Sequence, residues 1–164
     1  MSFIEANRVI EAPLASVWGA IADFARVEDF DPYVRTSKML TSQRAGVGAA
    51  RRLTFEDGSS ASERVTDWYD GAWMQVEVFE HTLPVEAAAI SVCVHATDGG
   101  TLVSMAMDYA PAPGFFGALV DRWVVRGQFE RHFAQVLAGL DGHVRKRTAR
   151  TERDAFSVFA AAMA

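Results

Sequence analysis

Among the side chains that could bind a ligand or transfer a proton are those of Arg51, Glu63 and Tyr109. An arginine could anchor a ligand carboxylate or enolate. A buried glutamate can act as a hydrogen-bond acceptor or a general base, because burial raises the pKa of a carboxyl group. A tyrosine could donate a hydrogen bond to a ligand carbonyl. Two structural alternatives stay open, in which Glu63 is an exposed strand carboxylate and Arg51 is only its structural partner.

Other kinds of site find no support in the sequence. Cys93 and His95 lie two residues apart on one face of a strand-like run, which is too few ligands for a metal site. The chain has no Gly-x-Ser-x-Gly nucleophile motif and no glycine-rich phosphate loop after a strand. The Gly46-Val-Gly48 stretch indicates a turn. We therefore expect no metal and no cofactor.

The composition indicates one globular domain. Of the 164 residues, 50% are hydrophobic and 11% are aromatic, which is enough for a well-filled core. A net charge of −5 argues against a nucleic-acid binder, because phosphate contacts need a basic face. The single cysteine, Cys93, excludes an internal disulfide and fits a reducing compartment. With no signal-peptide pattern and no apolar run of about 18 residues, we expect a cytoplasmic protein without a membrane span.

Alternation of apolar and polar residues predicts about seven strands. Asp57-Gly58, Asp70-Gly71 and Asp98-Gly99-Gly100 are hairpin signals, so consecutive strands should pair antiparallel. Two short helices are expected after the first strand, one from Pro13 to about Ala22 and one from Asp23 to Asp31. The predicted strands are Phe3–Ile10, Thr36–Thr41, Ala49–Phe55, Ser60–Trp68, Ala72–Phe79, Ala87–Thr97 and Thr101–Ala110.

A long helix is predicted from about Gly114 to His143. Its apolar residues recur every three or four positions and form one broad face that the sheet must cover. They are Phe116, Leu119, Val120, Trp123, Phe133, Leu137 and Leu140. An antiparallel sheet with segregated helices makes the fold α+β. Residues 144–164 form a basic and then apolar tail, for which a helical extension, disorder and contact with a second copy all stay open.

Three groups of residues form a pattern over about residues 3–143. They are Ile10-Glu-Ala-Pro13 with Val17-Trp18 and Asp23-Phe24, then Gly48-Ala-Ala-Arg51 with Asp57-Gly58 and Ser62-Glu63-Arg64, and finally the helix Gly114–Leu140. This pattern resembles the START-related helix-grip superfamily (SRPBCC), which includes bacterial polyketide cyclase/dehydrase-like proteins, birch-pollen-allergen-like proteins and plant abscisic-acid receptors. The resemblance implies that residues 1–143 form a curved antiparallel sheet around the C-terminal helix, with an apolar cavity between them.

The resemblance also implies which side chains face the cavity. It places Glu63 inward, and strand alternation then turns residues of the two neighbouring strands inward as well. Arg51 and Glu63 could meet there as a charged pair. His81 resembles the His-x-Leu loop that closes over ligand in the plant receptors, with a surface-loop histidine as the alternative. The residues expected to line the cavity are Arg51, Leu53, Phe55, Glu63, Met74, Val76, His81, Phe116 and Trp123.

The facing of the Thr101–Ala110 strand stays open at this stage. Hydrophobicity favours one set of alternating residues as buried, and the register of the resemblance favours the other. The first set is Val103, Met105, Met107 and Tyr109, and the second is Leu102, Ser104, Ala106 and Asp108.

Our first functional hypothesis is binding of a small hydrophobic molecule, lipid-like, aromatic or polyketide-like, between sheet and helix. The alternative is a polyketide aromatase/cyclase- or dehydratase-like enzyme, with Glu63, His81 or Tyr109 as acid or base. A third interpretation is an interaction module with a packed interior. The expected partner is a small hydrophobic ligand and no nucleic acid, and the tail could join two copies into a homodimer.

Overall fold

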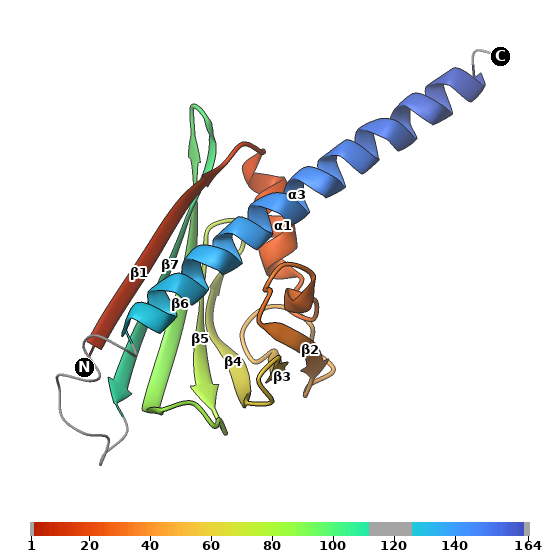
Figure 1. Cartoon of the computed structure of the whole chain (residues 1–164). Helices are drawn as coiled ribbons and strands as arrows, with labels where there is room; N and C mark the ends of the chain where they lie inside the picture. The colour runs from red at the N-terminus through yellow and green to blue at the C-terminus, as the bar shows by residue number, and fades with distance from the viewer. Residues whose placement is uncertain (1, 112–125, 163–164) are drawn as a thin grey trace.

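The computed structural model describes residues 2–111 and 126–162. These residues form a seven-stranded antiparallel sheet with a long helix lying across one face (Figure 1). The α+β helix-grip architecture predicted from the sequence is confirmed. The strands are β1 (Ser2–Ile10), β2 (Val34–Met39), β3 (Ala50–Phe55), β4 (Ser60–Tyr69), β5 (Trp73–Phe79), β6 (Val85–Thr97) and β7 (Gly100–Pro111).

The order of the strands follows the chain with one exception. The order in the sheet is β1-β7-β6-β5-β4-β3-β2, so every strand from β2 to β7 pairs with its neighbour in sequence. Only β1 is displaced, and it pairs with β7 over its whole length, from Ser2 opposite Tyr109 to Ile10 opposite Thr101. Short hairpins produce this arrangement because each turn brings the next strand back antiparallel.

The segment between β1 and β2 contains one α-helix rather than two. Helix α1 (Leu14–Ala22) follows Pro13 as predicted. The second predicted helix, Asp23–Asp31, is wrong, because this segment forms only the single 3₁₀ turn Val27–Asp29. The amides of Phe30 and Asp31 both bond to the Val27 carbonyl, at 3.1 and 2.8 Å. The turn closes there because Pro32 follows and has no amide hydrogen to continue a helix.

Helix α3 (Arg126–Ala162) carries the apolar face that covers the sheet. Its buried apolar residues are Phe133, Val136, Leu137, Leu140 and Val144. The helix continues beyond the expected end near His143 to Ala162, so the helical extension is the one of the open alternatives for the tail that this structure has, and it projects past the sheet (Figure 1). Residues 144–162 contain no glycine or proline and are rich in alanine and arginine, which favour a helix.

Not every part of the predicted helix can be compared with the structure. Four members of its predicted apolar face, Phe116, Leu119, Val120 and Trp123, lie outside the described residues. Within the described ranges, no helix is long and apolar enough to cross a membrane.

The facing of β7 follows hydrophobicity. Val103, Met107 and Tyr109 are buried, whereas Asp108 is exposed. The register implied by the resemblance is therefore wrong for this strand. Burying the alternative set would have placed a carboxylate against the apolar face of α3, which is costly without a partner.

A buried carboxylate ties β1 to α3. Asp141 accepts hydrogen bonds from Arg8 at 2.8 and 3.0 Å and from Arg145 at 2.6 Å. Burial by itself raises the pKa of Asp141, but the bonds from the two arginines outweigh it and hold this pKa below its usual value of 3.8. The charged form of Asp141 therefore stabilises the docking of the helix on the sheet.

Candidate functional site

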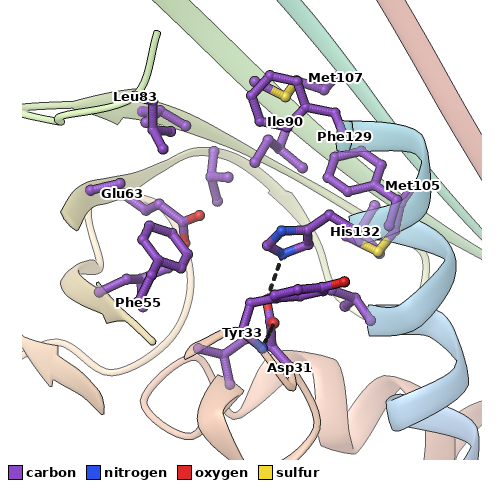
Figure 2. A pocket seen from close by; sticks show the side chains of 18 of the residues that line it. Asp31, Tyr33, Phe55, Glu63, Leu83, Ile90, Met105, Met107, Phe129 and His132 are labelled. Carbon is purple, nitrogen blue, oxygen red and sulfur yellow. Dashed lines mark hydrogen bonds and ion pairs between the residues drawn. The ribbon is translucent and has the colours of Figure 1, made fainter. Parts of the chain in front are cut away.

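A pocket of about 610 Å³ lies between the inner face of the sheet and α3 (Figure 2). This volume is in the range of small-molecule sites. Most of the lining is apolar and comes from strands β3 to β7 and from α3, including Leu53, Val76, Ile90, Met105 and Phe129. Ile90 and Met105 are only partly buried although both lie on interior strands of the sheet. Their remaining exposure is explained by the pocket that they face.

The paired strands β3 and β4 bring Arg51 and Glu63 together in this pocket. The two residues are directly opposite in the strand register. Nε of Arg51 donates to Oε2 of Glu63 at 2.7 Å, and Nη2 lies 2.6 Å from the same oxygen in an ion pair. Nη1 of Arg51 donates to the Phe24 carbonyl oxygen at 2.7 Å, and its guanidinium lies 3.8 Å from the Phe24 ring centre. The predicted charged pair is therefore present, and Arg51 is held firmly by protein groups.

The Glu63 carboxylate has one oxygen that this pair leaves available. Both contacts with Arg51 use Oε2 of Glu63, and no other described residue donates a hydrogen bond to Oε1. Figure 2 shows the carboxylate pointing toward the middle of the pocket. Glu63 thus presents a hydrogen-bond acceptor to any molecule bound there.

A second polar group enters the pocket from α3. Nε2 of His132 lies 3.2 Å from Oδ2 of Asp31, and the other oxygen of Asp31 accepts the Tyr33 amide hydrogen at 2.9 Å. The His132 ring stacks on the Tyr33 ring, with centres 4.4 Å apart and planes inclined by 26°. The Asp31 side chain is 9% exposed. A buried carboxylate and an aromatic ring therefore fix the orientation of this histidine.

His132 and Glu63 approach the pocket from opposite sides. In Figure 2 the imidazole extends from α3, with one nitrogen toward Asp31 and the other toward the interior of the pocket. The Glu63 carboxylate lies across the pocket on the side of the sheet. A molecule bound between them would contact one polar group at each end and apolar side chains along its length.

The chain matches a known protein family over most of its length. The family described as polyketide cyclase/dehydrase and lipid transport matches residues 1–145. The chain belongs to this family. The matched region ends just after Val144, a buried residue of α3, so it contains the sheet and the part of the helix that packs on it. Among curated proteins, the sequence comparison found no match.

Solved structures with low sequence identity share the fold of this family member. Protein XoxI of Bacillus cereus has 20% identity and a TM-score of 0.73, covering 87% of this chain and 94% of its own. A Thermus thermophilus protein has 18% identity and a TM-score of 0.76, with coverages of 89% and 99%. The Zhui aromatase/cyclase of a Streptomyces species has 17% identity and a TM-score of 0.76, with coverages of 90% and 95%. At these identities the likeness concerns the fold alone.

Most of the side chains predicted for the site of this family member do line the pocket. Those that do are Arg51, Leu53, Phe55, Glu63, Met74 and Val76. Their role in binding stays a prediction. Phe116 and Trp123 lie outside the described residues.

Two predicted residues, His81 and Tyr109, are not among the residues that line the pocket. His81 follows Glu80, whose φ of +44° turns the chain away from the direction of β5. Tyr109 does point to the inner side of the sheet, but it is 1% exposed and packs against Phe129, with ring centres 5.6 Å apart. Neither side chain therefore contributes an acid or a base to the wall of this pocket.

Sequence reasoning missed Asp31, Tyr33 and His132. A signal for His132 was present, since it lies on the apolar side of the predicted helix, between Phe129 and Val136. A polar residue on such a face needs a partner when it is buried. Asp31 and Tyr33 flank Pro32 and lie in a segment predicted partly as helix, so no local pattern paired them with α3.

The described residues offer no cluster of three His, Cys, Asp or Glu side chains that could hold a metal ion. Cys93 and His95, the pair considered in the sequence, are both exposed on the outer face of β6. The absence of a metal or cofactor stays a prediction.

Proposed function

We propose that this protein binds a small, largely apolar molecule in the pocket between the sheet and α3. The observation that carries the proposal is the incomplete burial of apolar side chains on interior strands, Ile90 and Met105 above all, in a pocket of about 610 Å³. Burying about 200 Å² of apolar ligand surface would contribute roughly 5 kcal/mol before the entropic cost of binding. The family description, which includes lipid transport, supports the same chemistry.

The proposal is tested by filling the pocket. Ile90→Trp should occupy part of the volume and weaken the binding of an apolar fluorescent probe at least tenfold. Cys93→Trp makes a similar change on the exposed face of the same strand and should leave the affinity unchanged. Fluorescence titration measures both dissociation constants. Equal affinities in the two variants, or no saturable binding by the wild type, would contradict the proposal.

A second candidate function is an enzyme of the polyketide aromatase/cyclase or dehydratase type. The observation that favours it is a buried carboxylate, Glu63, with an oxygen available to the pocket. Such a group can transfer protons to and from a bound substrate. Glu63→Gln should abolish product formation from a poly-β-carbonyl substrate while the fluorescent probe still binds. A wild-type protein that binds the substrate and leaves it unchanged would support the carrier function instead.

A cytoplasmic location and a homodimer joined through the tail also remain proposals. The homodimer is supported by the exposure of the basic residues of α3 after Val144, because no described residue of the domain covers this part of the helix.

A further inference from the structure

The polar groups of the pocket determine what kind of apolar molecule it can hold. We propose that the ligand carries a hydroxyl group and that Nδ1 of His132 accepts the hydrogen bond from this hydroxyl. This inference rests on the proposed binding function and names the chemical class of the ligand. Its basis is the proton arrangement that the pocket geometry imposes on His132.

Asp31 determines which nitrogen of His132 carries the proton. A carboxylate only accepts hydrogen bonds, so the Nε2 that lies 3.2 Å from Oδ2 of Asp31 must be the donor. In a neutral imidazole the other nitrogen then has a lone pair and no hydrogen. Among the described residues, Nδ1 of His132 has no hydrogen-bond partner, and Figure 2 shows that nitrogen on the pocket side of the ring. Nδ1 can therefore accept a hydrogen bond from a ligand.

The opposite wall of the pocket also presents a hydrogen-bond acceptor. Oε1 of Glu63 is an acceptor without a partner in the described part of the chain. The N–H groups of Arg51 are directed to Oε2 of Glu63 and to the Phe24 carbonyl oxygen. The Tyr33 hydroxyl can donate or accept a hydrogen bond, so it favours neither a donor nor an acceptor on the ligand. Among the described residues, the two inward-facing polar atoms without a partner, Nδ1 of His132 and Oε1 of Glu63, are therefore both acceptors, which favours a ligand with a hydrogen-bond donor.

The charge of the interior excludes the ligand carboxylate that Arg51 suggested from the sequence. Arg51 and Glu63 neutralise each other, and Asp31 adds the carboxylate that faces His132. At the exposed outer part of the pocket, Glu56 is paired with Arg35, and Asp57 and Arg131 add one charge of each sign. A carboxylate would lose its hydration and meet a negative potential, whereas a hydroxyl group is uncharged and supplies the missing donor.

Three naphthalene probes separate these possibilities because they share one apolar body. 2-Naphthol carries a donor, 2-methoxynaphthalene replaces it with an ether, and 2-naphthoate carries a carboxylate. Titrations at about pH 8 keep an ordinary imidazole neutral, since its pKa is about 6.5, and keep a phenol protonated, since its pKa is near 10. We expect 2-naphthol to bind about 5- to 10-fold more tightly than the ether, and 2-naphthoate at least tenfold more weakly than the ether.

Two variants test whether His132 causes this preference. His132→Phe keeps a ring against Tyr33 but removes the acceptor, so the ratio of the naphthol and ether affinities should fall to about 1. In Asp31→Asn, the amide oxygen can still accept the Tyr33 amide hydrogen, which leaves the NH₂ group facing Nε2 of His132. The imidazole proton then moves to Nδ1, and the preference for naphthol should again disappear. A purely structural role of Asp31 would weaken all three probes in parallel.

A matched control uses the other histidine of the same helix segment. Burial lowers the pKa of His143, and its ring contacts the pocket residue Phe30, with centres 6.2 Å apart, but His143 itself does not line the pocket. His143→Phe should leave the naphthol-to-ether ratio at its wild-type value. Circular dichroism identifies any variant that does not fold, and the isosteric Asp31→Asn decides the question if His132→Phe fails this test.

The failures of the two proposals differ. If the wild type binds naphthol and the ether equally, or prefers naphthoate, the inference about the hydroxyl group is overturned while the binding function stands. If none of the three probes binds, the binding function itself is overturned, and the inference falls with it. Loss of the naphthol preference in both His132→Phe and Asp31→Asn, with the preference retained in His143→Phe, supports the inference.

Discussion

Two glycines of α3 should respond in opposite ways to the same substitution. Gly139 packs against the segment that leads to Asp31: a methyl group on Gly139 would overlap the Phe30 carbonyl oxygen and lie 3.1 Å from the carbonyl carbon. A methyl group on Gly142 would meet no atom within 4 Å. Both residues lie inside the helix, so alanine should gain about 1 kcal/mol of helix propensity at either position. Only the packing differs.

The size of the difference follows from what must move. The atoms that the new methyl group would overlap belong to the backbone of Phe30 and not to a flexible side chain. Overpacking a rigid site costs typically 1–3 kcal/mol, and a backbone neighbour places this case at the upper end. Gly142→Ala should therefore be about 1 kcal/mol more stable than the wild type, and Gly139→Ala about 2 kcal/mol less stable.

Urea unfolding followed by circular dichroism measures both free energies, with unchanged slopes showing that the same transition is compared. In a domain of this size the gap of about 3 kcal/mol corresponds to roughly 6–12 °C in melting temperature. If Gly139→Ala were as stable as Gly142→Ala, the close approach of Phe30 to the helix would be refuted. The packing argument for the position of Asp31 would be refuted with it.

Three further predictions concern charged groups and the tail. Glu63→Ala should cost about 3–5 kcal/mol in urea unfolding because it leaves Arg51 charged and buried, and the double variant with Arg51→Met should recover most of this loss; no recovery would contradict it. Asp141 has a lowered pKa, so its contribution is complete above the ordinary value of 3.8 and is lost as pH falls through the folded-state value. In Asp141→Asn the unfolding free energy should therefore fall less steeply as the pH is lowered in the acid range. An unchanged slope would argue against the two arginine bonds. Deleting residues 149–164 removes a part of α3 whose described side chains are exposed, so it should change the unfolding free energy by less than about 0.5 kcal/mol, while native mass tests whether a dimer is lost.

The strands could be predicted because their signals are local. A turn such as Asp57-Gly58 between two alternating runs determines which strands pair and, through the period of two, which side chains share a face. Placing Glu63 inward was enough to derive the facing of Arg51 and Met74 on the neighbouring strands. In β7 the sequence left two facings open, and the burial of Val103 and Tyr109 agrees with the one that hydrophobicity favours.

The ends of the helices were less predictable because they depend on competing weak terms. Asp23–Asp31 contains residues that tolerate a helix, yet the amides near Asp31 close a 3₁₀ turn before Pro32. At the other end, apolar periodicity stops near Val144, and the helix continues because Arg, Lys and Ala favour it without any packing. Burial patterns predict where a helix packs, but they do not predict where it ends.

The contact between Asp31 and His132 could not be predicted from either segment by itself, because 101 residues separate them and neither lies in a recognisable motif. Two local oddities nevertheless concern the same contact. His132 is a polar residue on an apolar helix face, and Gly139, seven residues later on that face, lowers helix propensity where alanine would be favoured. The structure explains the glycine by the approach of Phe30, the residue before Asp31. A glycine and a histidine two turns apart on a helix that covers a sheet therefore indicate that a loop docks there and supplies the partner of the histidine.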